Sequence, residues 1–285
     1  MGKKEKIAIL LDKLFVVKFL FYITKIYYGK HIRVVNYHST PPFEADNFEA
    51  QLKFFQANYS SVSYKDLEEF YKTGKWTKTK PGLIFSFDDG FRDNVDVAVP
   101  LLEKYGFKGW FFIPVGMIDL SSEEQKEFVG KNENRYHVEY KDGRYLMSWD
   151  EIKGLYNNHV VGCHTWSHHR MNINDTDEVL TKEITLSKQL MENKLEKPIS
   201  IFCWAGGEER TYTKAAAKKI KESGYKFSFI TNTYPVKSGQ SPLQINRTNI
   251  ESRNSLSLVR FQLSLLMDIF YIPKRKRVSE VLTLE

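Results

Sequence analysis

Two clusters of polar side chains follow apolar runs of the kind that form buried strands. Asp88 and Asp89 come directly after one such run, and His164 and His168 follow another. Two imidazoles four residues apart can face one ion, and a carboxylate from a neighbouring strand end completes a His, His, Asp ligand set. The residue types and their spacing therefore predict a site for a divalent metal.

Adjacent carboxylates repel each other and are costly to desolvate, so a pair at the tip of a buried strand needs a physical reason. If one aspartate binds a metal, the ion offsets the repulsion. The other can then take a proton from metal-bound water, whose pKa falls to roughly 7. Three protein ligands leave a coordination position open for that water, which is typical of catalytic zinc sites.

Each motif has a plainer alternative. An Asp-Asp-Gly stretch after a strand is often a solvated turn, and two histidines at this spacing often bind nothing. Cys163 directly precedes His164, but neighbouring side chains of an extended strand point to opposite faces. We therefore interpret Cys163 as a core residue and not as a fourth ligand.

The middle of the chain alternates short apolar strands with amphipathic helices. Strands are expected at 32–38, 83–87, 109–115, 160–164, 199–204 and 227–231, and helices at 47–58, 63–74, 93–106, 148–158, 177–195 and 213–224. This order predicts an α/β fold with a parallel sheet, and the lack of an obvious linker favours a barrel over two domains. The charged stretch 119–145 is expected to be an inserted loop or lid.

The composition narrows the choice of partners and compartment. The chain has 285 residues and a net charge of +7, but the basic residues gather at the two ends and no nucleic-acid recognition motif accompanies them, so nucleic acid is not an expected partner. The two cysteines, Cys163 and Cys203, do not suggest a disulfide framework. A reducing compartment is therefore expected.

Both ends of the chain are apolar and basic. Lys13, Lys18 and Lys25 interrupt the apolar stretch 7–28, which argues against a cleavable leader and against a spanning helix. A broad apolar face edged by lysines is typical of a helix that lies in a membrane interface.

The stretch 255–273 repeats this pattern, with Ser257, Arg260, Ser264 and Asp268 in one narrow polar stripe. We expect this helix to stop at Pro273 and to be followed by a basic tail, 274–277, suited to anionic headgroups. Core or dimer-interface helices with solvated tails are the alternative for both ends.

The stretches FSFDDG (85–90) and HTWSH (164–168) together resemble the polysaccharide deacetylase family, also called the NodB-homology or carbohydrate esterase family 4 enzymes. The resemblance extends over about residues 33–260 and includes VVNYHSTPP, GWFFIPVGMI and INRTNI in the order that the family shows. It implies a distorted (β/α) barrel of about seven parallel strands. The expected units are an amphipathic N-terminal helix over 1–30, a catalytic domain over 31–252, and an amphipathic helix with a basic tail over 253–285.

The resemblance also implies roles for single residues. Asp88 would be the general base, and Asp89, His164 and His168 would hold the metal, usually Zn²⁺, although Co²⁺, Ni²⁺ or Mn²⁺ can serve in the family. Water on the metal would attack the amide carbonyl of an N-acetylated sugar. The metal and a backbone N–H near Gly206 would hold the oxyanion.

Three features depart from the usual family pattern. No histidine follows His169, so the usual late acid is missing; His38 matches an early Tyr-His motif of the poly-N-acetylglucosamine deacetylase branch and would replace it, unless it is structural. Trp204 and Gly206 lie in Trp-Ala-Gly-Gly where relatives often have Tyr-Pro-Tyr-Gly; they are expected to bind substrate or its oxyanion, in a groove that loses an aromatic wall and would be wider. Arg247 is the nearest match to the arginine that orients the base, or else it is a surface residue.

These patterns favour a metal-dependent N-deacetylase acting on a bacterial surface glycan (lipopolysaccharide, capsule or exopolysaccharide) or on its lipid-linked precursor. The terminal helices would place it at the cytoplasmic face of the inner membrane, or it would be cytoplasmic. Removal of a formyl group from a similar sugar is a second enzymatic hypothesis. A catalytically silent glycan-binding or scaffold protein with the same fold is the alternative from another class. The sequence does not indicate an oligomeric state.

Overall fold

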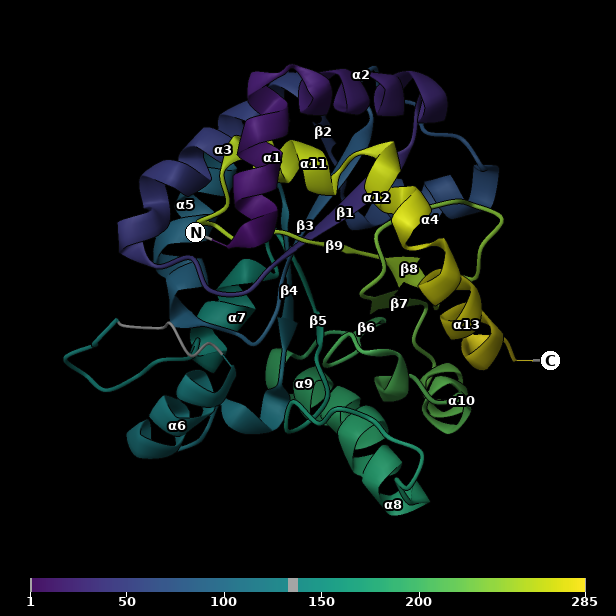
Figure 1. Cartoon of the computed structure of the whole chain (residues 1–285). Helices are drawn as coiled ribbons and strands as arrows, with labels where there is room; N and C mark the ends of the chain where they lie inside the picture. Colours follow the sequence, from purple (N-terminus) through teal and green to yellow (C-terminus); the bar gives the residue numbers. More distant parts are fainter. Residues whose placement is uncertain (1, 133–137, 285) are drawn as a thin grey trace.

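The fold is a closed barrel of parallel strands surrounded by helices (Figure 1). A computed structural model describes residues 2–132 and 138–284. The strands are β1 (Ile32–Tyr37), β2 (Ser60–Ser61), β3 (Gly82–Phe87), β4 (Gly109–Ile113), β5 (Val160–Cys163), β6 (Ile201–Cys203), β7 (Phe227–Ile230), β8 (Ile245–Asn246) and β9 (Thr248–Asn249). They pair in the order β8-β7-β6-β5-β4-β3-β1-β9, with β2 beside β3.

The barrel closes through one strand that is interrupted at Arg247. On one side of this residue β8 pairs with β7, and on the other side β9 pairs with β1, in both cases parallel. If β8 and β9 are taken as halves of a single strand, the order above gives seven positions around the ring. The predicted distorted (β/α) barrel of about seven strands is therefore confirmed.

The helices cover the outside of this ring. They are α1 (Lys3–Lys13), α2 (Val16–Tyr28), α3 (Ala45–Asn58), α4 (Tyr64–Thr73), α5 (Val99–Lys104), α6 (Ser122–Asn132), α7 (Trp149–Leu155), α8 (Asp177–Leu180), α9 (Ser187–Leu195), α10 (Lys214–Glu222), α11 (Leu256–Gln262), α12 (Leu265–Phe270) and α13 (Ile272–Leu282). The stretch predicted as an inserted loop at 119–145 contains α6, and its residues 133–137 lie outside the described part of the chain.

Side chains alternate between the barrel interior and the helix layer, as the pleat of a strand requires. In β3, Ile84 belongs to the interior cluster, whereas Leu83 and Phe85 pack against the helices. In β6, Cys203 faces the interior and Phe202 faces outward. This alternation decides which residues beyond each strand end can reach the centre of the barrel.

The N-terminal segment is two helices that meet at a sharp corner. Phe15, at the corner, has a φ of 60°, a left-handed conformation in which a helix cannot continue. The expectation of one helix over 1–30 is therefore wrong. Helix α2 packs on the barrel layer through Phe21, whose ring lies 5.3 Å from that of Phe54 and 6.4 Å from that of Tyr59.

The C-terminal segment is also divided. Pro273 lies in the first turn of α13 instead of ending a helix, a position in which its missing N–H costs nothing. The basic stretch 274–277 is therefore helical and not a free tail. Lys274 Nζ donates to the carbonyl oxygens of Gly207 and Thr231, and Arg275 Nη1 donates to the carbonyl oxygen of Thr233.

A buried ion pair joins the C-terminal helices to the barrel. Arg33, on the outer face of β1, donates through Nη1 to Asp268 Oδ1 of α12 at 3.1 Å and through Nη2 to Asp268 Oδ2, and both side chains are almost fully buried. Among residues 2–132 and 138–284, none of the helices combines the length and the hydrophobicity that a membrane span requires.

We expect Asp268→Ala to lower the free energy of unfolding by about 3–5 kcal/mol, because it leaves the Arg33 guanidinium buried without a counter-charge. Urea unfolding followed by circular dichroism measures this change. Arg277→Ala is the matched control: it removes an exposed pair with Glu209 and should cost less than about 1 kcal/mol. Equal losses in the two variants would show that the buried pair does not anchor the C-terminal helices.

Candidate active site

The predicted site residues lie together at the carboxyl ends of the barrel strands. Asp88 and Asp89 follow β3, and His164 follows β5. Asp89, Thr165 and His168 all have left-handed backbone conformations, with φ of 70°, 68° and 56°. Such conformations are costly for residues other than glycine and gather at functional sites, where the surrounding structure holds them.

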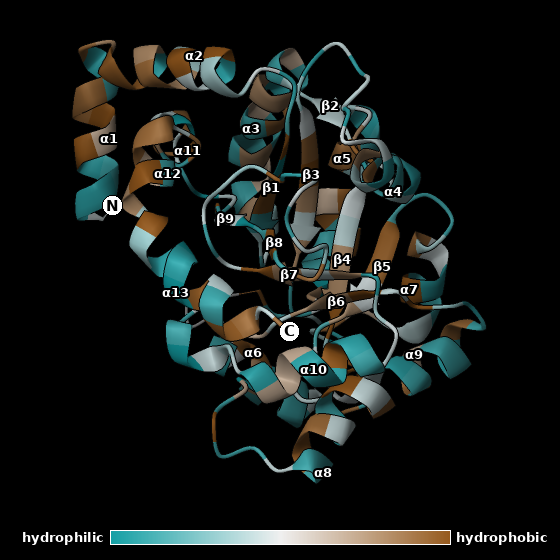
Figure 2. Cartoon of the chain, turned by 90° about the vertical axis from the view of Figure 1, so that its right-hand side faces the viewer, coloured by the Kyte–Doolittle hydropathy of each residue, from teal (hydrophilic) through white to brown (hydrophobic). Residues whose placement is uncertain are grey.

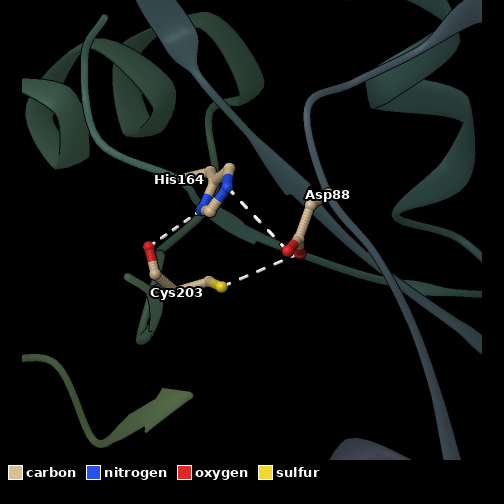
Figure 3. A group of neighbouring side chains, drawn as sticks. All are labelled: Asp88, His164 and Cys203. Atoms are coloured by element: carbon tan, nitrogen blue, oxygen red, sulfur yellow. Dashed lines mark hydrogen bonds and ion pairs between the residues drawn. The ribbon is translucent and has the colours of Figure 1, made fainter. Parts of the chain in front are cut away.

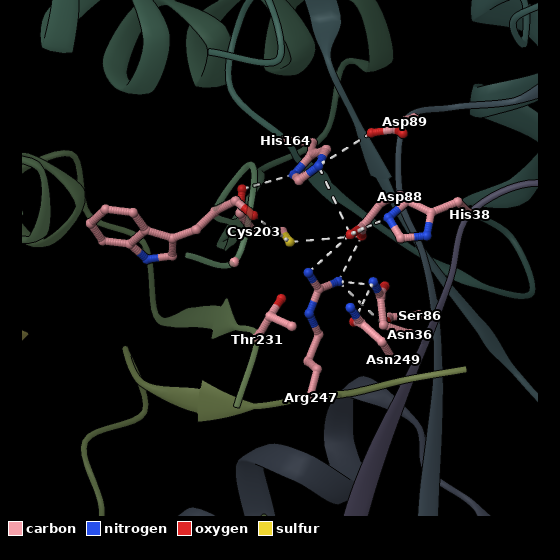
Figure 4. Close-up of polar contacts among 12 residues, drawn as sticks. Asn36, His38, Ser86, Asp88, Asp89, His164, Cys203, Thr231, Arg247 and Asn249 are labelled. Atoms are coloured by element: carbon pink, nitrogen blue, oxygen red, sulfur yellow. Dashed lines mark hydrogen bonds and ion pairs between the residues drawn. The ribbon is translucent and has the colours of Figure 1, made fainter. Parts of the chain in front are cut away.

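Asp89, His164 and His168 form a compact cluster of possible metal ligands (Figure 4 labels the first two). Asp89 Oδ1 lies 3.4 Å from His164 Nε2 and 3.1 Å from His168 Nε2. This oxygen is buried and accepts no hydrogen bond. An orphaned buried carboxylate oxygen between two imidazole nitrogens is what a bound cation would satisfy, so the residues fit a divalent metal.

The electrostatics of Asp89 and His168 also suit a metal. Burial alone would raise the pKa of Asp89, but His168 and His164 hold it well below its usual range, so the carboxylate is ionised. Burial lowers the pKa of His168, which favours the neutral imidazole that binds metals. His164 Nδ1 lies 3.0 Å from the carbonyl oxygen of Cys203, and a proton on Nδ1 leaves Nε2 as the ligand atom.

Asp88, His164 and Cys203 form a second cluster that is less suited to a metal (Figure 3). Both oxygens of Asp88 are already bound to the Arg247 guanidinium, which would repel a cation. Burial raises the pKa of the Cys203 thiol, so the thiolate that binds metals is disfavoured. Of the two clusters, the one that contains Asp89 therefore fits a metal better.

The carboxylate of Asp88 is held by Arg247 in a two-point pair. Arg247 Nη1 donates to Oδ1 at 2.6 Å and Nη2 donates to Oδ2 at 2.9 Å, and both residues are buried (Figure 4). Asn36 Oδ1 accepts a further bond from Arg247 Nη1 at 2.8 Å. Burial alone would raise the pKa of Asp88, but Arg247 and His164 hold it below its usual range. The pairing of Arg247 with Asp88, one of two alternatives from the sequence, is thus the observed one.

His38, at the end of β1, lies beside this pair. Its Nε2 is 4.0 Å from Asp88 Oδ2, and its Nδ1 is 3.5 Å from Glu251 Oε1. Burial alone would lower the pKa of His38, but Glu251, with smaller contributions from Asp89 and Asp88, raises it to about 9. Sequence reasoning missed Glu251, because no motif surrounds it and only closure of the barrel brings it to β1.

Six side chains described above line one cavity of about 560 Å³: His38, Asp88, Asp89, His164, His168 and Arg247. Gly206 and Gly207 border it, as do Lys274 and Tyr271 from the C-terminal helices. Gly206 has a φ of 83°, a conformation that favours glycine. Its role as an oxyanion donor stays a prediction.

The structure corrects the expectation that Trp204 contacts substrate. Because Cys203 faces the barrel interior, the next side chain faces the helix layer, where Trp204 is 1% exposed. Its Nε1 donates to Ser228 Oγ at 2.9 Å, and its ring lies 5.4 Å from that of Tyr212. The indole is therefore a core group and not a wall of the cavity.

Comparison with known proteins gives one family. The model of the polysaccharide deacetylase family matches residues 75–228, more than half of the chain, which confirms the resemblance found in the sequence. YxkH of Bacillus subtilis (strain 168) is 24% identical over 204 residues, which are 71% of this chain and 63% of that protein. The matched region thus spans less than two thirds of that relative's length.

Solved structures show the same fold. The Streptococcus pyogenes deacetylase PplD, solved in complex with acetate, is 18% identical with a TM-score of 0.64, and the match covers 82% of this chain and 98% of that chain. IcaB from Ammonifex degensii is also 18% identical with a TM-score of 0.64, over 82% of this chain and 97% of that one.

We expect the purified chain to bind one Zn²⁺, and His168→Ala to weaken that binding by about a hundredfold or more, since even residues that only orient a ligand contribute tenfold to a hundredfold. Isothermal titration calorimetry measures the affinity. Cys203→Ser and Asp88→Asn are the controls and should bind zinc within a few-fold of the wild type. If Cys203→Ser weakens binding as strongly as His168→Ala does, the second cluster holds the metal.

Proposed function

This chain belongs to the polysaccharide deacetylase family, and on that basis we propose that it is a metal-dependent hydrolase that removes the acetyl group from an N-acetylated amino sugar. One observation carries the proposal. An ionised Asp88, His38 with Glu251 behind it, and the Asp89 cluster meet at one cavity, which Asp88, His38 and the cluster line. A volume of about 560 Å³ lies within the range of small-ligand sites.

In this proposal Asp88 accepts the proton of the attacking water. Arg247 keeps the carboxylate ionised and fixes its orientation through two hydrogen bonds. His38 is protonated at neutral pH and donates its proton to the leaving amine nitrogen. His38 Nε2 lies 4.0 Å from Asp88 Oδ2, so one bound amide can be within reach of both side chains.

Asp89, His164 and His168 would hold Zn²⁺, or another divalent ion such as Co²⁺, Ni²⁺ or Mn²⁺, which would acidify a water and polarise the carbonyl oxygen of the amide. The backbone at Gly206, which borders the cavity, is proposed to donate to the same oxygen as negative charge develops on it.

The proposed substrate is an amino sugar of a bacterial surface glycan (lipopolysaccharide, capsule or exopolysaccharide) or of its lipid-linked precursor. A polar cavity lining supports a hydroxyl-rich ligand; it includes Asn36, Asn249, Thr231, Thr233 and Glu208. We also propose that the enzyme works at the cytoplasmic face of the inner membrane, which the apolar and basic terminal helices support.

Replacing either proposed proton-transfer group should remove most activity. We expect Asp88→Asn and His38→Ala each to lower kcat by about 10²- to 10⁴-fold, the usual contribution of acid–base catalysis. Amine release from N-acetylglucosamine oligomers measures the rate.

His169→Ala is the matched control for His38→Ala, because His169 pairs with Asp175 at 2.9 Å and is not among the residues that line the cavity. It should keep near wild-type activity. A wild-type protein that binds zinc but releases no amine from polymeric or lipid-linked sugars would favour the silent glycan-binding alternative.

The pH dependence of kcat should show the raised pKa that Glu251 gives to His38. Because His38 must be protonated to act as an acid, the rate should fall as the pH rises through its pKa of about 9. Glu251→Gln removes the charge that raises this pKa, so the alkaline limb should move to lower pH. An unchanged alkaline limb in Glu251→Gln would assign the acid to another group.

A further inference from the structure

We propose that helices α1, α2 and α12 form a docking surface for an anionic lipid bilayer, with the mouth of the cavity at its edge. The docking surface consists of large apolar side chains that are 45–71% exposed: Ile7, Leu10, Leu14, Phe15, Phe19, Tyr22, Ile26, Leu266, Ile269 and Phe270. Apolar patches built from this many large residues are uncommon on monomeric soluble proteins and mark interaction sites.

The first two helices turn an apolar face toward solvent as well as one toward the protein. In α1, Ala8 is buried, whereas Leu10 lies on the opposite face and Leu14, which directly follows the helix, is also exposed. In α2, Phe21 points inward, and Phe19, Tyr22 and Ile26 lie on the outer side. Burial in the protein core therefore does not explain these residues.

The helices that carry the docking surface are fixed to one another. The backbone N–H of Leu265, the first residue of α12, donates to Thr24 Oγ1 of α2 at 2.7 Å. Ser257 Oγ of α11 donates to Asp12 Oδ2 of α1 at 2.7 Å. Figures 1 and 2 show α1, α2, α11 and α12 side by side at one end of the molecule.

The charges around the docking surface favour lipid as the occupant. Lys3, Lys4, Lys6, Lys13 and Lys18 are exposed, and within the described residues none of them forms an ion pair. The two acidic residues of α1 point inward instead: Glu5 Oε1 accepts from the N–H of Ser255, and Asp12 Oδ2 pairs with Arg260.

The outer face of α1 thus presents apolar and cationic groups together, as helices that bind anionic membranes do. A two-fold dimer through the same face would bring like-charged lysines together, so a second copy of the chain is the weaker candidate.

Helix α12 links the docking surface to the cavity. Phe270 is 71% exposed, and the next residue, Tyr271, lines the cavity together with Lys274. A bilayer that contacts Phe270 therefore lies beside Tyr271 and the cavity that Tyr271 lines. On the proposed function, on which this step rests, the substrate class is an N-acetylated sugar carried by a lipid.

Binding to vesicles tests the docking surface without an activity assay. Wild-type protein should cosediment with vesicles of phosphatidylglycerol and phosphatidylcholine, and the double variant Leu10→Glu/Phe19→Glu should bind roughly tenfold more weakly or worse. Leu186→Glu, on the segment between α8 and α9, is the matched control and should bind like the wild type. Circular dichroism checks that each variant is folded.

Failure of the wild type to bind these vesicles, or equal binding by the double variant, would overturn the proposal. So would a wild-type dimer that the double variant dissociates, because the same face would then be a subunit interface.

A fluorescent label tests the position of the cavity mouth. The two native cysteines are fully buried, so a cysteine introduced by Phe270→Cys can be labelled selectively with an environment-sensitive dye. Its emission should increase with vesicles, and that of Leu186→Cys should not. If the protein binds vesicles but the emission of the dye at position 270 does not change, the mouth of the cavity faces away from the bilayer.

The substrate class is tested by amine release in the wild type. An N-acetylglucosaminyl lipid in vesicles should be deacetylated faster than the free sugar, and Leu10→Glu/Phe19→Glu should lose this advantage while keeping its rate on the free sugar. Equal wild-type rates would overturn the substrate class and leave the proposed function intact. No hydrolysis of either substrate would overturn both, whereas the docking surface is judged by vesicle binding.

Discussion

The buried pair between Arg247 and Asp88 is the constraint on which the site depends. Neither charge could be buried alone, because burying a single ion costs several kcal/mol of desolvation free energy. Removing one partner of a buried pair lowers the free energy of unfolding by ~3–5 kcal/mol. Arg247 lies at the point where β8 gives way to β9, so the strand that closes the barrel also delivers the cation to the carboxylate. Closure of the fold and ionisation of Asp88 are therefore achieved by the same contact.

This pair also gives the two adjacent aspartates different surroundings. Because Arg247 occupies both oxygens of Asp88, that side chain can accept a proton but is poorly suited to bind a cation. Asp89 has a left-handed backbone, which turns its carboxylate away from the arginine and toward His164 and His168. Two carboxylates at one strand tip are tolerated because Asp88 is paired with Arg247, whereas Asp89 faces His164 and His168.

The parallel barrel, and the meeting of Asp88 and His164 at one end of it, could be predicted from the sequence, because the alternation of strands and helices places the carboxyl ends of all the strands at the same end. The outward direction of Trp204 follows from the pleat of β6, because neighbouring residues of a strand face opposite sides and Cys203 faces the interior. The motif around Trp204 indicated the cavity instead, and that prediction was wrong. Glu251 could not be predicted, since its contact with His38 depends on how the last strand closes the ring. The helix boundary at Pro273 was missed because a proline can begin a helix as well as end one.

The terminal helices also depend on a buried charge. Arg33 faces outward from β1, where an uncovered guanidinium would be solvated, yet it is 0% exposed because α12 covers it and supplies Asp268. The barrel therefore needs these helices to satisfy one of its own strands, which argues against a detachable tail. Since α12 is held to β1 by this pair and to α2 by the bond to Thr24, the apolar outer surface keeps a fixed distance and direction from the cavity. A bilayer bound there would orient the reactive groups as well as retain the protein.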